Sequence, residues 1–286
     1  MQVPWRDRRG RFLWLKAVVL PALFVPGLLY AVWLATDQLG GRPVMETIHG
    51  TGLWTIRLLL VSLAITPFAR ALEWPDLLLV RRMVGVSAAC YAVAHLTLYV
   101  VDQNFRFGTV VSEIALRFYL TIGFVALLGL LALAGTSTDA AMQRLGRNWK
   151  RLHRLAYPIG VIALLHYFIQ SKLKVSEPVF VTGLFLWLML WRALPEGWQR
   201  SRNFSLAAGL YAGLAGLSAL ATAAVEVAWY GLATKVDPWR VLAANETLAR
   251  GLRPAHWVFV VTLGIAVVVL TRRAWPMLRR PQKAVV

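Results

Sequence analysis

Eight long apolar runs dominate this sequence of 286 residues. At a rise of about 1.5 Å per residue, a helix needs about 20 residues to cross a hydrocarbon core of about 30 Å. The runs of suitable length are residues 12–34, 49–68, 83–101, 117–135, 154–171, 178–194, 204–230 and 255–275. Runs of this length satisfy their backbone polar groups in lipid as helices. The sequence therefore predicts an all-α integral membrane protein, a bundle of about eight transmembrane helices.

The composition agrees with this class. Hydrophobic residues make up 58% of the chain and charged residues only 15%, and the mean hydropathy is +0.59. A net charge of +18 would point to nucleic acid in a soluble protein, but here the basic residues lie between the apolar runs. We expect membrane lipid as the surroundings of the chain and no binding to nucleic acid.

The distribution of Lys and Arg predicts the orientation. If the N-terminus is cytoplasmic, residues 1–16, 69–82, 136–154, 192–203 and the C-terminal tail lie on the cytoplasmic side and hold 21 of the 31 basic residues. The opposite side holds nine, and Arg57 lies within a run. Because positive charge is retained on the cytoplasmic side, both termini are predicted to be cytoplasmic.

The longest loop, residues 231–254, carries a helix signal of its own. Asp237 is placed as an N-cap, Pro238 follows at the first helical position, and apolar residues recur at helical spacing. We expect a short helix on the outer membrane surface there. No internal repeat is evident in the sequence.

Two of the five histidines lie at matching depth in the predicted bundle. His95 and His166 fall in the outer halves of the third and fifth runs, which cross the membrane in the same direction. A b-type haem takes axial nitrogen ligands from opposite faces of its ring, so this pair is the candidate axial pair. Cys90 is the single cysteine, so a haem would be held non-covalently. His49 and His256, at span ends, are expected to be hydrogen-bonded interior residues.

A third histidine lies at the inner membrane boundary. His153 precedes His166 by 13 residues, about 20 Å along a helix. On the third run, the position about fourteen residues before His95 is Arg81, a poor iron ligand that suits a haem propionate. Helical periodicity leaves open whether His153 serves a second, inner haem or faces solvent and headgroups.

Several motifs occur in a recognisable order along the chain. They are IHGTGLW (48–54), ITPFAR (65–70), RRMVGVSAACYAVAHLTLYV (81–100), RFYLTIG (117–123) and TSTDAAMQRLGRNWKRLHRLAYPIGVIALLHY (136–167). Together they resemble the MsrQ (YedZ) family, within the ferric reductase and NADPH oxidase-like transmembrane superfamily, over about residues 12–194.

The resemblance implies a redox function in the bacterial inner membrane. It implies one or two haems b, FMN, and electron delivery to a periplasmic molybdenum-containing methionine sulfoxide reductase of the MsrP type. The family's haem histidines map onto His95, His153 and His166, and His49 matches a recurrent family histidine without an assigned role. It also divides the chain into a six-helix haem-binding core, residues 1–199, and an extension with two further spans, residues 200–286.

The expected electron source follows from what the chain lacks. The sequence has no G-x-G-x-x-G loop after a strand and no room for a cytosolic FAD and NADPH module. We therefore expect a redox subunit that takes electrons from the quinone pool or from a separate cytosolic flavin reductase. Whether the chain is itself an enzyme stays open, and no FMN ligand stands out.

Two alternatives remain from the residues alone. One is another quinol-coupled b-type cytochrome with a different partner. The other is a transporter in which histidines relay protons or bind a metal ion. The transporter is disfavoured because only Glu226 supplies a carboxylate within a span.

Overall fold

The computed structural model describes residues 5–6, 10–172, 174–199, 201, 203–247 and 251–278, the last four by their backbone alone. The described residues are almost entirely helical and contain no strand beyond an isolated bridge between Arg6 and Phe12. They fall into two compact units, residues 1–66 with 75–170 and residues 67–74 with 171–286. The division at residue 199 into a family core and an extension stays a prediction.

The all-α membrane architecture is confirmed. Among the described residues, seven helices are long and apolar enough to cross a membrane: Trp14–Ala35, Pro43–Ala71, Pro75–Asp102, Phe118–Gly135, Arg147–Ser171, Phe204–Thr234 and Pro254–Ala274. The remaining expected span forms α9 (Ser176–Ala193), an 18-residue helix that carries Glu177 in its first turn and Arg192 in its last. These two terminal charges make α9 less apolar than the other seven.

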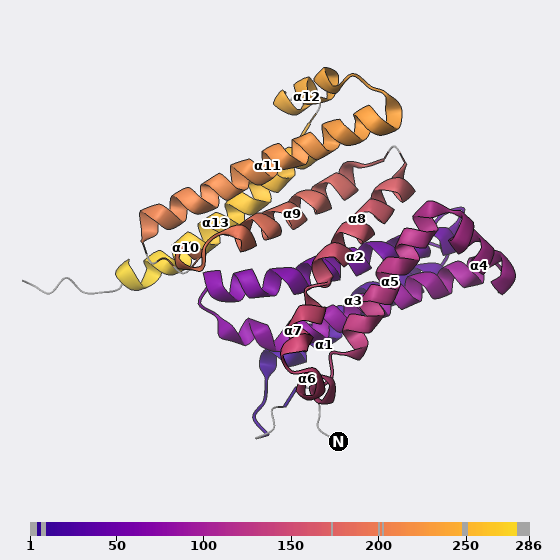
Figure 1. Cartoon of the computed structure of the whole chain (residues 1–286), viewed down its shortest axis with the longest axis horizontal. Helices are drawn as coiled ribbons and strands as arrows, with labels where there is room; N and C mark the ends of the chain where they lie inside the picture. The colour runs from indigo at the N-terminus through magenta and orange to yellow at the C-terminus, as the bar shows by residue number, and fades with distance from the viewer. Residues whose placement is uncertain are drawn as a thin grey trace, which may run out of the picture. The chain divides into compact units, whose positions relative to one another are not determined.

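The first unit contains five of the spans and the short helices that join them. Its α3 packs against α1 and α5, and the short α4 packs against α5 (Figure 1). The elements are α1 (Trp14–Ala35), α2 (Pro43–Ala71) up to Thr66, η1 (Pro75–Leu77), α3 (Leu78–Asp102), α4 (Phe107–Leu116), α5 (Phe118–Gly135), α6 (Asp139–Leu145), α7 (Arg147–His153) and α8 (Ala156–Ser171).

A tyrosine from α3 enters the hydrogen-bond ladder of α1. The Tyr91 hydroxyl accepts a hydrogen bond from the Gly27 N–H at 2.8 Å and donates to the Leu23 carbonyl at 2.9 Å. In an uninterrupted helix the Gly27 N–H would bond to Leu23 directly. The inserted hydroxyl opens α1 next to Pro26, whose ring already interrupts the ladder, and joins the two helices.

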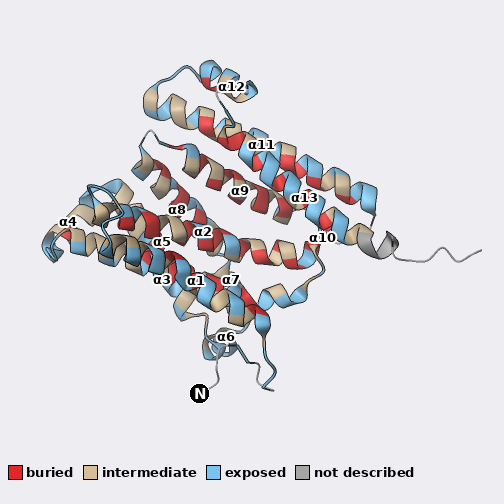
Figure 2. Ribbon diagram, turned by 180° about the vertical axis from the view of Figure 1, so that it is seen from behind, coloured by how far each residue is buried: buried red, intermediate tan, exposed pale blue. Residues whose placement is uncertain are grey.

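The second unit is built on three long helices. Its α11 packs against α9, α12 and α13, and α13 packs against α9. Buried residues line the facing sides of α9 and α11, while apolar side chains are exposed outward (Figure 2). Gly183 allows this close approach, because a Cβ there would lie 2.3 Å from the Thr222 hydroxyl. The elements are α9, α10 (Glu196–Gln199), α11 (Phe204–Thr234), α12 (Pro238–Glu246) and α13 (Pro254–Leu278).

The predicted loop helix is confirmed as α12. The Asp237 side chain accepts a hydrogen bond from the Trp239 N–H, and Pro238 occupies the first helical position. Of its apolar residues, Val241 is buried against the unit and Trp239 is exposed. Its place at a membrane surface stays a prediction.

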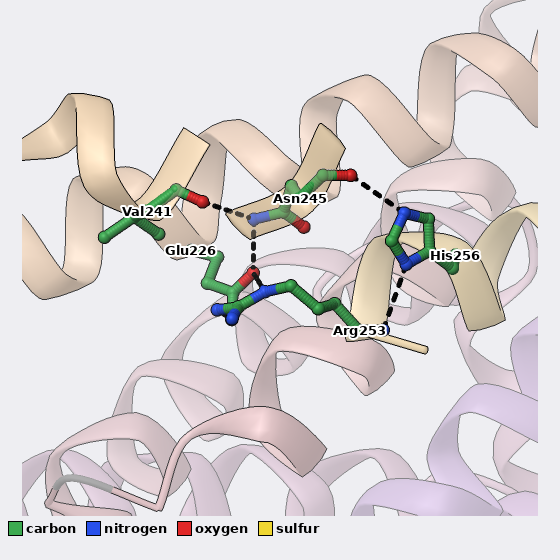
Figure 3. A network of polar contacts seen from close by, with 5 residues as sticks. All are labelled: Glu226, Val241, Asn245, Arg253 and His256. Carbon is green, nitrogen blue, oxygen red and sulfur yellow. Dashed lines mark hydrogen bonds and ion pairs between the residues drawn. The ribbon is translucent and has the colours of Figure 1, made fainter. Parts of the chain in front are cut away.

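A buried ion pair and its hydrogen-bond partners join α12 to α11 within the second unit. Glu226 on α11, only 1% exposed, pairs with the Arg253 guanidinium at 2.6 Å and accepts from the Asn245 amide at 2.9 Å. The His256 Nδ1 accepts from the Arg253 N–H, and its Nε2 donates to the Asn245 carbonyl (Figure 3). The expectation that His256 is a hydrogen-bonded residue is confirmed. Glu226, the carboxylate that the sequence analysis placed within a span, therefore has a structural role in this ion pair.

Replacing Arg253 should destabilise the second unit more than replacing Glu226. Arg253→Met leaves a fully buried carboxylate without its cation, at a cost of about 3 to 5 kcal/mol. Glu226→Gln leaves a guanidinium that is 23% exposed and still reaches solvent, so we expect a smaller loss. Thermal unfolding of the full chain in detergent measures both, and equal midpoints for the two variants would contradict this ranking.

Candidate functional site

The His95 ring is oriented by the helix that precedes it. His95 lies on α3, and its Nδ1 is 2.8 Å from the carbonyl oxygen of Ile48 on α2. A carbonyl oxygen only accepts, so Nδ1 carries the proton and the lone pair lies on Nε2. Metal-binding histidines are commonly held in this way, with one nitrogen tied to a carbonyl and the other free to ligate.

His166 has the same arrangement on a second pair of helices. It lies on α8, and its Nδ1 is 2.7 Å from the carbonyl oxygen of Tyr119 in the first turn of α5. Its Nε2 is therefore also the nitrogen with the free lone pair.

A glycine makes room for each ring. Gly52 follows Ile48 by four residues, and Gly123 follows Tyr119 by four, so each lies on the helix face beside the carbonyl. A Cβ at Gly52 would lie 3.0 Å from Nδ1 and Cε1 of His95, and one at Gly123 would lie 2.8 Å from the same atoms of His166. Any larger residue would press on the imidazole.

The two arrangements are related by a constant shift along the chain. Ile48, Gly52 and His95 correspond to Tyr119, Gly123 and His166, each 71 residues later. The helix pairs α2–α3 and α5–α8 thus have the same arrangement of a carbonyl, a glycine and an imidazole. The correspondence consists of three positions and a helical pattern, without similar sequence.

The two rings lie at a distance that suits a metal between them. Their centroids are 6.4 Å apart, and their planes are nearly perpendicular, at 84°. A metal–nitrogen bond of about 2 Å, added to about 1.2 Å from the nitrogen to the ring centre and then doubled, gives about 6.4 Å. The distance, the two free Nε2 atoms and the two fixed Nδ1 atoms together fit axial ligation of a haem iron.

Around His153, the last residue of α7, the residues are arranged differently. The Nδ1 of His153 lies 3.1 Å from the Trp149 carbonyl, and its Nε2 lies 3.3 Å from the Ser137 hydroxyl. The ring also stacks on Trp149, with centroids 3.9 Å apart. Both nitrogens therefore have protein partners, and a metal would have to displace Ser137.

The position that corresponds to His153 on α3 is Arg82 rather than Arg81. The shift of 71 residues relates Arg82 to His153, and Arg82 forms an ion pair with Asp139. Arg81 is exposed, and its carbonyl accepts a hydrogen bond from Ser62. His49 is exposed on α2, so the expectation of an interior role for it is wrong.

The sequence analysis identified the two imidazoles but not the carbonyls and glycines that position them. The depth argument brought His95 and His166 together, whereas the Ile48 and Tyr119 carbonyls carry no signal in residue type. A signal for Gly52 and Gly123 did exist, because each stands 43 residues before its histidine in HGTG and LTIG.

Comparison with known proteins agrees with this site. Residues 51–164 match the family model described as ferric reductase like transmembrane component. The heme-binding subunit MsrQ of protein-methionine-sulfoxide reductase from Xanthomonas campestris pv. campestris (strain 8004) is 45% identical over 166 residues, which cover 58% of this chain and 74% of that protein. The MsrQ of Rhodospirillum rubrum is 38% identical over 192 residues, which cover 66% of this chain and 90% of that protein.

The chain belongs to the MsrQ family. No solved structure matches it. The matched region of the ferric reductase model contains Gly52, His95, Gly123 and His153 and ends two residues before His166. Both glycines and the Tyr119 carbonyl therefore lie within the region that matches this wider family, whereas the Ile48 carbonyl lies three residues before it.

Filling either glycine should disturb the imidazole next to it. Gly52→Ala and Gly123→Ala place a methyl group in van der Waals overlap with His95 or His166, at a cost of about 1 to 3 kcal/mol. We expect each variant to lose haem during purification and to show a shifted Soret band, measured per polypeptide. Gly209→Ala on α11, where a Cβ meets open space, is the matched control. Full haem content with an unchanged spectrum in both site variants would contradict the packing described.

Proposed function

We propose that this chain is the membrane electron-transfer subunit of a methionine sulfoxide reductase system. It lies in a bacterial inner membrane and holds a haem b between His95 and His166. It delivers electrons to a catalytic subunit of the MsrP molybdoenzyme type on the periplasmic side. The observation that carries the proposal is the pair of imidazoles with ring centroids 6.4 Å apart, each fixed through Nδ1. The names of the MsrQ relatives support the haem and the reductase system.

The residues of the chain perform three tasks in this proposal. A bound haem supplies a one-electron couple, and the protein positions and tunes it. The Ile48 and Tyr119 carbonyls make the imidazoles more electron-rich through the Nδ1 hydrogen bonds, which favours the oxidised form of a ligated metal. Gly52 and Gly123 set how closely the rings approach the helices. The surrounding apolar spans exclude water from the pair.

Quinol is the proposed electron source, because a membrane-soluble donor can reach a site inside a bundle from the lipid. A cytosolic flavin reductase is the second candidate that the sequence analysis leaves. FMN stays a prediction from the resemblance, and we assign no residue of the described chain to it and no step to a flavin.

Removal of either axial imidazole should abolish haem binding at this site. His95→Ala and His166→Ala each leave a single nitrogen ligand, so we expect loss of the Soret band of this haem and of all electron delivery to the partner. His49→Ala, which changes an exposed histidine of α2, should keep both. The measurement is a dithionite-minus-oxidised spectrum of purified full-length protein, and unaltered haem in both site variants would exclude the pairing.

His153 is proposed to have a haem-related role at the inner end, as the resemblance implies, with Arg81 as a partner for a propionate. The variant His153→Ala should leave the His95–His166 haem in place and should lower total haem or slow electron entry. Haem counted per polypeptide and the rate of reduction measure the two effects. Wild-type values for both would return His153 to a purely structural role with Ser137 and Trp149.

A further inference from the structure

A network of polar side chains lies beside the imidazole pair, at the corner where α3, α4 and α5 meet. The Tyr99 hydroxyl on α3 donates to the Glu113 carboxylate on α4 at 2.5 Å. The other Glu113 oxygen pairs with Arg117 at 2.7 Å, and Arg117 also donates to the Tyr119 hydroxyl at 3.3 Å. The Glu113 side chain is only 22% exposed. None of these four residues was singled out as a site from the sequence.

This network reaches α3 one turn from His95 and the residue of α5 whose carbonyl holds His166. Tyr99 follows His95 by four residues, so it lies on the same face of α3 one turn further along. Tyr119 is the residue whose carbonyl holds the His166 Nδ1. The Glu113 carboxylate therefore contacts Tyr99, one turn from His95, directly and reaches Tyr119 through Arg117.

The same corner is open to lipid. Three apolar side chains of α4 and the first one of α5 are strongly exposed: Phe107 64%, Val111 66%, Leu116 84% and Phe118 66%. Both neighbouring helices are membrane spans, so these side chains meet acyl chains or the headgroup boundary. Glu113 lies on the short apolar α4 between these two spans, where its carboxylate is mostly buried and is paired with Tyr99 and Arg117. A lipid-soluble molecule can approach Glu113 from the bilayer without passing through the protein.

The position of the imidazole pair favours electron arrival from the outer side. Among the described residues, His95 and His166 are the pair with free Nε2 atoms, in the half of the bundle expected to face outward. His153 lies 13 residues away, about 20 Å along the chain, and both of its nitrogens have protein partners. A donor that acts at the outer end reaches this pair directly, and the haem-related role proposed for His153 at the inner end would serve the second candidate donor, a cytosolic flavin reductase.

Proton balance favours the same side. Reduction of a methionine sulfoxide takes up two protons and two electrons and yields methionine and water. Oxidation of a quinol to a quinone releases two protons and two electrons. If both reactions take place toward the outer side, the protons are released where they are consumed.

We propose that Glu113, with Tyr99 and Arg117, forms a quinol-oxidation site at the α3–α4–α5 corner. This inference rests on the proposed function and specifies its electron entry. The Glu113 carboxylate takes the first O–H proton of the quinol and passes it to the outer aqueous phase, then takes the second in the same way. The two electrons leave singly to the acceptor held by His95 and His166. Tyr99 and Arg117 hold the carboxylate in place for the quinol hydroxyl.

The test compares Glu113→Gln with wild type in the full chain, reconstituted in nanodiscs. Decylubiquinol is the donor, and 2-heptyl-4-hydroxyquinoline N-oxide, a quinol-site ligand, is the probe for calorimetric binding. Loss of a general base is expected to slow haem reduction by decylubiquinol about a hundredfold or more and to weaken binding of the probe. The haem content, dithionite-reduced spectrum and midpoint potential should stay at wild-type values. Glu46→Gln, which changes an exposed acid in the first turn of α2, is the matched control.

Three results would overturn the inference. A wild-type rate with decylubiquinol in Glu113→Gln excludes the carboxylate as the proton acceptor. A shifted midpoint potential with unchanged probe binding shows that the network positions His166 instead. If Glu113→Gln loses haem, Tyr99→Phe provides the same measurements with the carboxylate intact, and wild-type rate and binding there exclude the site. Failure of the wild type to accept electrons from decylubiquinol, with haem present, rejects quinol as the donor in the proposed function itself.

Discussion

The Nδ1 hydrogen bonds of His95 and His166 are the constraint on which the rest of the site depends. Each fixes the ring plane and the tautomer, and so decides which nitrogen can bind a metal. A helix carbonyl usually serves the N–H four residues later, but its second lone pair is free to accept from a neighbouring helix. The residue four positions on must then be small, which is why Gly52 and Gly123 accompany these carbonyls.

The spans and the imidazole pair could be predicted from the sequence because they depend on residue type and depth. Run length and polarity located the helices, and the counting of residues along the third and fifth runs brought His95 and His166 to one level. The supports could not be predicted, because a main-chain carbonyl has no signature in the sequence. His153 illustrates the same limit: its spacing suggested a ligand, while contacts with Ser137 and Trp149 decide its partners.

The constant shift of 71 residues shows where the two helix pairs are equivalent and where they differ. At one end of the helices it relates two equivalent imidazoles, and at the other it relates His153 to Arg82, which pairs with Asp139. A guanidinium does not ligate iron, so the two ends of the unit have diverged in chemistry. The buried Glu226 network has a separate role in the second unit, where a satisfied ion pair fastens a surface helix.

The most direct test of the central claim is the electron paramagnetic resonance spectrum of the oxidised full-length protein with haem bound. Two imidazoles with planes 84° apart predict a highly anisotropic low-spin ferric signal, distinct from the rhombic signal of parallel rings. This signal should disappear in His95→Ala and in His166→Ala. A high-spin ferric signal in the wild type, or a low-spin signal that persists in both variants, would contradict ligation by this pair.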